Sequence, residues 1–219
     1  MRIFAAIAGF LFSVSVFAAD APSPVKFLEG RDYVLLDSPL PPVNAGKIEV
    51  TEVFSYICPH CFRFEPLVEE WEKKQKSDVA LVQIHMQWSE QMKAYQRGYY
   101  TAVTLKIKDK VQLPVFNRIH KDGKPLDTAE AWADFFSAYG VNKQTVLSTY
   151  DSFIVSGLMS QGDTRIRAFK ISSTPELVVD GRYKISTPGG MDEAKAHEQM
   201  LQIADFLIAQ TRAERAAKH

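Results

Sequence analysis

The two cysteines of this chain, Cys58 and Cys61, stand three residues apart and are the side chains best suited to chemistry. They flank Pro59 and His60 in the sequence Cys-Pro-His-Cys, which follows an apolar run and precedes residues with helical spacing. The pair is therefore predicted where a buried strand ends and a helix begins. The first turn of a helix presents unpaired backbone N–H groups and the positive end of the helix dipole, so a thiolate is stabilised there.

The four residues of this motif have distinct expected roles. Pro59 fits the first helical turn because a backbone N–H is not needed there. His60, when protonated, adds positive charge beside the sulfur of Cys58. Cys58 is predicted to be the exposed nucleophile, and Cys61, one turn further along the apolar face, is predicted to be the resolving thiol.

Two structural uses of the cysteine pair are weaker alternatives. A bridge between Cys58 and Cys61 closes a very short loop, so it removes little entropy from the unfolded chain. A zinc site needs more ligands, but the chain has no second cysteine pair and its histidines lack the spacing of zinc ligands. We therefore expect no metal and no cofactor. The histidines are His60, His85, His120, His197 and His219.

The N-terminus, residues 1–19, has the pattern of a secretory signal peptide. A positive charge at Arg2 precedes an apolar run over residues 3–17, and the small residues Ala18 and Ala19 follow. A retained membrane anchor is the alternative, but the run is shorter than the roughly 20 residues of a membrane-spanning helix. We therefore expect cleavage after one of the two alanines and a mature protein outside the cytosol.

Length and composition allow one large domain, or one domain that carries an insert. The chain has 219 residues, of which 46% are hydrophobic, which is enough for a sizeable core. Basic and acidic residues number 26 each, so the charge balance does not point to nucleic acid as a partner. Two cysteines are too few for the disulfide scaffold of a small secreted domain.

The residues around the motif are predicted to form a strand–helix–strand unit. A short edge strand is expected at residues 32–36, a longer strand at residues 47–57 and a third strand at residues 79–88. Alternation along the second strand makes Glu52 the one charged group on an apolar face. Glu52 is either an acid at the sheet margin or a buried carboxylate beneath the cysteines, with a raised pKa and a role in moving protons.

Residues 90–163 are predicted to be a helical insert, because no convincing strand pattern occurs there. A first helix is expected at residues 91–106, and Pro114 is expected to punctuate the segment that follows. Later helices are expected to begin at polar N-caps, and their aromatic residues are expected in the core. The expected N-caps are Asp127, Asn142 and Ser152.

The last part of the chain is predicted to contain a β-hairpin and a helix. The hairpin is expected around Asp180-Gly181, which lies between two β-rich runs. The helix is expected from Met191 to about Ala209, with His197 at its surface or boundary. Residues 211–219 are charged and are expected to fray.

The chain resembles the DsbA family of periplasmic thiol:disulfide oxidoreductases. The resemblance rests on Cys-Pro-His-Cys after an aromatic strand, on the helical insert, and on Thr174-Pro175 before the Asp-Gly hairpin. It covers essentially the whole mature chain and is strongest in residues 52–66 and 174–191. The family has an α/β, thioredoxin-like fold with a helical domain inserted between its two halves. This implies a division of the mature chain into residues 20–89, 90–163 and 164–219.

The resemblance also implies an activity and partners. Cys58 would form mixed disulfides with reduced, unfolded secreted proteins in the periplasm, and a DsbB-like, quinone-linked membrane protein would reoxidise the pair. The Cys58 thiol would be strongly acidic and its disulfide with Cys61 strongly oxidising. Pro175 would be a cis proline packed against the disulfide.

Substrate recognition is expected to be broad. The backbone of Thr174 would pair with an extended substrate segment, because Pro175 has no backbone N–H to compete for it. Apolar surface near Pro188 and Met191 is expected to complete a groove that recognises shape and apolarity more than sequence.

Two residues depart from the family pattern. Gln83 stands where members commonly have a lysine that pairs with the buried glutamate, so Glu52 is expected to lack this partner and to have a more strongly raised pKa. Thr174 stands where the best-known member has valine, and threonine there also occurs in disulfide isomerases. Isomerase or reductase activity is therefore the first alternative. The isomerases carry an N-terminal dimerisation domain, for which residues 20–57 are too few, so we expect a monomer. A non-catalytic, chaperone-like binding module is the second alternative.

Overall fold

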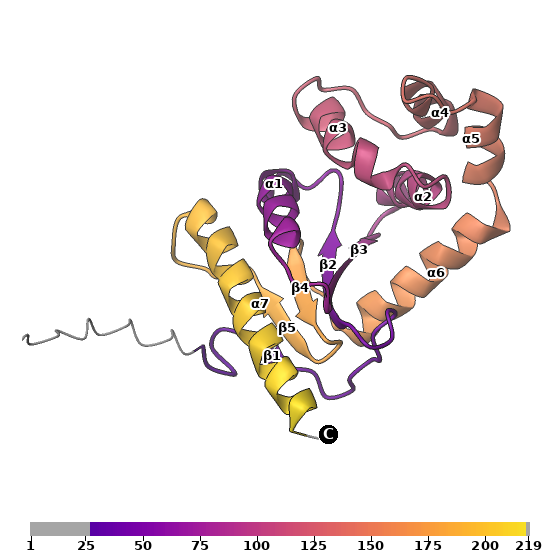
Figure 1. Ribbon diagram of the computed structural model, residues 1–219. Helices are drawn as coiled ribbons and strands as arrows, with labels where there is room; N and C mark the ends of the chain where they lie inside the picture. Colours follow the sequence, from indigo (N-terminus) through magenta and orange to yellow (C-terminus); the bar gives the residue numbers. More distant parts are fainter. Residues whose placement is uncertain (1–26, 218–219) are drawn as a thin grey trace, which may run out of the picture.

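A computed structural model describes residues 27–217 of the chain, and the expected signal peptide lies outside this part. A five-stranded sheet, with the order β1–β5–β4–β2–β3, forms its centre (Figure 1). β2 and β3 run parallel, whereas the other neighbouring strands run antiparallel. The strands are β1 (Val34–Leu35), β2 (Ile48–Phe54), β3 (Val79–His85), β4 (Glu176–Val179) and β5 (Tyr183–Ser186).

Helices cover both faces of the sheet and form a separate group beyond the edge strand β3 (Figure 1). α1 and α7 pack on one face and α6 on the other, while α2 to α5 form the group beyond β3. The thioredoxin-like fold with a helical insertion is thus confirmed. Between residues 27 and 217, no helix is long and apolar enough to cross a membrane. The helices are α1 (Pro59–Lys73), α2 (Glu90–Thr104), α3 (Lys108–His120), α4 (Ala129–Ser137), α5 (Lys143–Tyr150), α6 (Phe153–Ala168) and α7 (Glu193–Ala216).

Strand β2, which lies between β4 and β3, is buried along its whole length and on both faces. Val50 packs with α1 and α7, whereas Val53 packs with residues on the α6 side. Its two glutamates also point to opposite faces, because successive strand residues alternate. Glu52 lies on the face that α1 covers, where Gln83 donates to both Glu52 and Glu65 of α1. Glu49, on the opposite face, forms a buried ion pair with Arg165 of α6. The ion pair between Glu49 and Arg165 holds α6 against the sheet.

The helix α3 passes through Pro114, so the expected break in the pattern there was wrong. Proline inside a helix removes one backbone hydrogen bond and costs about 3 kcal/mol. Burial offsets this cost, because Val111, Val115 and Phe116 on either side of the proline are fully buried in the helical core. Tertiary packing therefore overrides the local preference.

The N-caps of the helical insert agree with the sequence at two of three positions. Asn142 caps α5 and Ser152 caps α6, each through a side-chain oxygen that accepts from backbone N–H groups. The expected cap at Asp127 was wrong by one residue. Thr128 has the extended backbone of an N-cap, and its hydroxyl oxygen accepts from the Ala131 N–H at 3.1 Å.

The last helix is longer and better fixed than the sequence indicated. α7 continues to Ala216, so the expected fraying from residue 211 was wrong for the described residues. Arg212 binds Asp78 before β3, and Arg215 binds Asp180 in the β4–β5 turn. The charged residues of the tail thus hold the helix against the sheet.

The hairpin expectation was confirmed, whereas the expectation for His197 was wrong. Asp180 and Gly181 both have positive φ angles, and the Arg182 N–H donates to the Val179 carbonyl to close the turn. His197 is 1% exposed and packs its ring on Phe64, with 4.8 Å between ring centroids. It belongs to the contact between α7 and α1.

Gly98 in α2 provides a test of packing in the helical insert. An added Cβ would overlap the buried ring of Trp132. Gly98→Ala should therefore lower the free energy of unfolding by about 1–3 kcal/mol, as overpacking does. Gly157→Ala in α6 is the control, because open space surrounds that position. It should raise stability by about 0.5–1 kcal/mol, as expected for glycine-to-alanine in a helix. Denaturant unfolding measures both, and equal effects would contradict the packing argument.

Candidate active site

Cys58 is the N-cap of α1, so the reactive thiol and the start of the helix are the same feature. Its backbone is extended, and its sulfur accepts a hydrogen bond from the Cys61 N–H at 3.4 Å. Pro59 occupies the first helical position, as predicted. The sulfur thus takes the place of the oxygen that serines and threonines usually provide at a helix N-terminus.

The thiol pKa of Cys58 is lowered from 9.0 to about 5. The largest cause is a hydrogen bond from the Cys61 side chain, and burial opposes it. Smaller contributions come from the Thr174 side chain and from the backbone N–H groups of Cys61 and His60. Cys58 is half-buried and therefore accessible. These conditions provide a thiolate at neutral pH.

Cys61 has the opposite environment. It is fully buried in the helical core, and burial is the main reason that its pKa lies well above 9.0. Donation of its S–H hydrogen to Cys58 and the nearby charges of Cys58 and Glu52 act in the same direction. The two thiols therefore differ strongly in acidity and in exposure, while their roles as nucleophile and resolving thiol stay a prediction.

The Thr174–Pro175 peptide bond is cis, as the resemblance implied. The sulfur of Cys58 lies 3.4 Å from the Thr174 carbonyl oxygen, although 116 residues separate the two in sequence. Pro175 is buried and Thr174 is partly exposed. The structure thus brings this pair of residues directly beside the reactive thiol.

The side chain of His60 is engaged by α7. His60 Nδ1 lies 2.5 Å from Glu193 Oε1, and Arg63 binds both oxygens of the same carboxylate. The two contacts hold the pKa of Glu193 at about 2, with Arg63 as the larger cause. The side chain of His60 therefore has a carboxylate partner, which sequence reasoning did not include.

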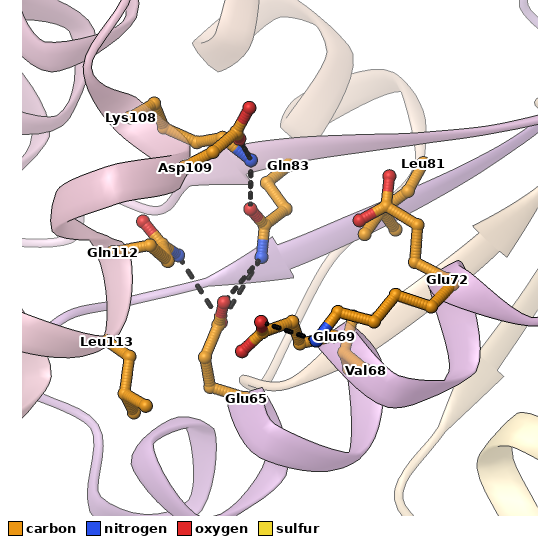
Figure 2. Close-up of a pocket in the computed structure, with 11 residues that line it drawn as sticks. Glu65, Val68, Glu69, Glu72, Leu81, Gln83, Lys108, Asp109, Gln112 and Leu113 are labelled. Atoms are coloured by element: carbon orange, nitrogen blue, oxygen red, sulfur yellow. Dashed lines mark hydrogen bonds and ion pairs between the residues drawn. The ribbon is translucent and has the colours of Figure 1, made fainter.

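Glu52 lies in a buried polar cluster beneath the cysteines. Gln83 Nε2 donates to Glu52 at 2.8 Å and to Glu65 of α1 at 3.2 Å, so one amide joins two carboxyl groups (Figure 2 shows the bond to Glu65). Burial raises the pKa of Glu52 to about 8 and that of Glu65 to about 6. The raised pKa of Glu52 was expected. Glu52 lacks the lysine partner that is common in the family, and the amide of Gln83 binds its carboxyl group instead.

Tyr56 is fixed at all three of its polar groups, two residues before Cys58. Its N–H donates to His85 of β3 at 3.0 Å, and its carbonyl accepts from His120 of α3 at 2.8 Å. Its hydroxyl donates to Gln112 of α3 at 2.6 Å. His85 is neutral, since burial lowers its pKa to about 3. The helical insert therefore holds the segment that leads into the cysteines.

The two expected groove residues lie at the surface. Met191 is 43% exposed just before α7. Pro188 lines a shallow hollow that also includes Tyr33 and Lys184, at the β1–β5 edge of the sheet. Their part in substrate binding stays a prediction.

Several residues of this site were missed at the sequence level. Glu65 follows Cys61 by four positions, so helical periodicity could have placed it on the same buried face. No such signal exists for Glu193, Gln112 and Lys108. They are far from the motif along the chain, so the spacing of residues does not predict their contacts. Only the tertiary arrangement of α3 and α7 brings them to the site.

Comparisons with known proteins agree with this geometry. Residues 49–201 match the family of DSBA-like thioredoxin domains. The thiol:disulfide interchange protein DsbA of Pseudomonas aeruginosa PAO1 is 36% identical over 85% of this chain and 87% of that protein. The protein of the same name from Pseudomonas syringae pv. tomato is 37% identical over 97% and 98%.

Solved structures of DsbA proteins have a similar fold. The crystal structure of Pseudomonas aeruginosa DsbA has a TM-score of 0.80 and 36% identity, and the match covers 88% of this chain and 97% of that chain. The oxidoreductase DsbA of Xylella fastidiosa has a TM-score of 0.78 and 29% identity, with 85% and 98% covered.

The lowered pKa of Cys58 predicts how the stability of the reduced protein depends on pH. The folded thiol ionises near pH 5 and the unfolded thiol near pH 9. The thiolate therefore contributes stability in full above pH 9, and this contribution is lost as the pH falls through 5. Relative to the oxidised protein, the reduced protein should gain unfolding free energy from pH 5 to 9. Denaturant unfolding of both forms measures this, and a constant difference would contradict the assigned thiolate.

The contact between Glu193 and His60 predicts a change in thiol acidity. Glu193→Gln removes a negative charge that neutralises Arg63, so the positive charge of Arg63 acts more strongly on the Cys58 thiolate. The Cys58 pKa should fall, which thiolate absorbance or alkylation rate against pH can measure. Glu198→Gln, at an exposed position on the same helix, changes the net charge equally and should leave the pKa unchanged. An unchanged pKa in both variants would remove the assigned role of Glu193.

Proposed function

Because the chain belongs to the DsbA family of thioredoxin-like thiol:disulfide oxidoreductases, we propose that it is an oxidase that donates the Cys58–Cys61 disulfide to reduced secreted proteins. The observation that carries the proposal is the unequal acidity of the two thiols. Cys58 is accessible with a pKa of about 5, whereas Cys61 is buried with a raised pKa. Such a pair favours the reduced form, so its disulfide is a strong oxidant.

The reaction proceeds by two exchanges. A substrate thiolate attacks the Cys58 sulfur, the bond to Cys61 breaks, and the electron pair goes to the Cys61 sulfur. A second thiolate of the substrate then attacks the substrate sulfur of the mixed disulfide, and Cys58 leaves as a thiolate. The low pKa of Cys58 supports this step, because thiols of low pKa leave faster. The products are a substrate disulfide and the reduced dithiol.

Glu52 is the proposed source of the proton for Cys61. The buried Cys61 thiolate needs a proton when the disulfide opens, since burial disfavours its charge. Glu52 is protonated at neutral pH, with a pKa of about 8, and it lies near enough to Cys61 for its ionised form to raise the pKa of that thiol. Its second oxygen, Oε1, is buried and makes no hydrogen bond with the rest of the described chain. This arrangement fits a carboxyl group that releases and regains a proton.

Substrate binding is proposed at Thr174 and Pro175, with Pro188 and Met191 at the margin of the surface. Thr174 lies against the Cys58 sulfur and is partly exposed, so its backbone can pair with an extended peptide. Met191 adds exposed apolar surface. A surface of this kind selects reduced, unfolded chains with little dependence on sequence.

Location and reoxidation follow from the family and the N-terminal sequence. The signal-like residues 1–19 support export to the periplasm. A DsbB-like, quinone-linked membrane protein is the proposed partner that restores the disulfide. We propose that the oxidase acts as a monomer and without a cofactor.

Single cysteine variants test the assigned roles. Cys58→Ser should abolish oxidation of a reduced model protein, because the attacked sulfur is lost. Cys61→Ser, mixed with a disulfide-bonded model protein, should accumulate a mixed disulfide through Cys58, because no second thiol can resolve it. Non-reducing electrophoresis and mass spectrometry identify the linked cysteine. Mixed disulfides on Cys61 in the Cys58→Ser protein would reverse the roles.

A further inference from the structure

A hollow of about 200 Å³ lies beside the buried carboxyl group of Glu65, between α1, β3 and α3 (Figure 2). Glu65 lines one wall, Gln83 another, and Lys108 and Gln112 of α3 a third. No residue of the Cys-Pro-His-Cys segment is part of these walls. The hollow therefore reaches Glu65 and its partner Gln83 from a side that does not involve the reactive thiol.

One amide joins the carboxyl pair to a single lysine. The Lys108 ammonium donates to Gln83 Oε1 at 3.1 Å, while Gln83 Nε2 donates to Glu52 at 2.8 Å and to Glu65 at 3.2 Å. An ammonium group only donates hydrogen bonds, so the amide oxygen must face Lys108 and the NH₂ group must face the carboxyl groups. Lys108 thus fixes the orientation of the bridge.

The two carboxyl groups are not equivalent within this network. Glu65 accepts from two amides, those of Gln83 and Gln112, which stabilise its charged form. Glu52 accepts from Gln83 alone within residues 27–217, and its other oxygen has no partner there. Glu65 is therefore the better site for the negative charge and Glu52 the better site for the proton.

Lys108 is the cation that acts on both carboxyl groups of the pair. Its ammonium also contacts Asp109, which is exposed, and the Lys108 side chain is 27% exposed. Lys73 binds Glu69 and Glu70 instead. The titratable and charged groups that face the pair or line the hollow are Tyr56, Tyr99, Cys58, Cys61, Glu69, Glu72, Lys73, Lys108 and Asp109.

We propose that Lys108 is a positioning residue for the thiol–disulfide reaction: its one positive charge, fixed against Gln83, matches one ionised carboxyl group and leaves the other to hold the proton for Cys61. The inference rests on the proposed function, in which Glu52 protonates Cys61 when the disulfide opens. Glu52 then becomes a carboxylate, and a proton taken up from water at the hollow, where Glu65 lies, restores it. The helical insert therefore sets the proton content of the redox site.

The charge of Lys108 acts in the expected direction on both groups. It lowers the pKa of Glu52 and that of Glu65, although burial outweighs it in each case. Without this charge, both carboxyl groups should keep their protons to higher pH. Lys108 is also the first residue of α3, where a cation opposes the helix dipole. Its removal should therefore not destabilise the helix.

The test measures the protonation of Glu52 and of Glu65 separately. Carboxyl ¹³C NMR titrations of Glu52 and Glu65 are recorded for the native protein, Lys108→Met, Lys108→Arg and Lys110→Met. Lys110 is the matched control, because it is exposed on the same helix and donates to the Tyr139 carbonyl, away from the hollow. In Lys108→Met both titrations should move to higher pH by on the order of 0.5–1 unit, the scale of one nearby charge. Lys108→Arg should restore them, and Lys110→Met should not move them.

A second measurement is the rate of mixed-disulfide formation between pH 6 and 10. The rate should fall as Glu52 ionises. In Lys108→Met this fall should occur at a higher pH, shifted by the same amount as the NMR titrations, and the midpoint of thermal unfolding should be unchanged. Titrations of Lys108→Met that superimpose on the native ones, or an equal shift in Lys110→Met, overturn the proposal. If the titrations shift but the protein oxidises no substrate, the proposed function fails and with it the catalytic role, while the electrostatic role of Lys108 stands.

Discussion

The hydrogen bond from the Cys61 N–H to the Cys58 sulfur ties the fold to the chemistry. It closes the first turn of α1, and it also stabilises the thiolate, so the N-cap of the helix and the reactive atom are the same group. Burial of Cys61 one turn later follows from the same helix, because residues three apart lie on one face. The difference in acidity between the two thiols thus results from where α1 starts and what it packs against.

The polar groups around this helix terminus come from three separate parts of the chain. β3 provides Gln83, α3 provides Gln112 and Lys108, and α7 provides Glu193. Each contact bears on a charge that the reaction creates or removes. The contacts from β3 and α3 provide hydrogen-bond partners for the buried carboxyl pair, and a buried polar group without partners is costly.

Local patterns predicted much of the fold and half of the site. The cysteine motif, Glu52, the cis Pro175 and the hairpin at Asp180-Gly181 are read from adjacent residues or from the resemblance. The course of α3 through Pro114 could not be read in this way, because the burial of its neighbours outweighs the local cost of proline. For the same reason, the extent of α7 depends on partners at Asp78 and Asp180 that only the folded chain brings near. Contacts such as Glu193 with His60, across 133 residues, carry no signal in one sequence.

The attachment of Tyr56 to α3 limits how the length of this region can change. Gln112 and His120 reach the tyrosine from the same helix, eight residues apart. One residue inserted between them would turn the later part of α3 by about 100° and advance it by about 1.5 Å, so the two contacts could not both form. The connection between α4 and α5 carries no such tie to Tyr56, and residues added there leave the helix in register. Relatives of this chain should therefore vary in length at that connection and keep α3 constant.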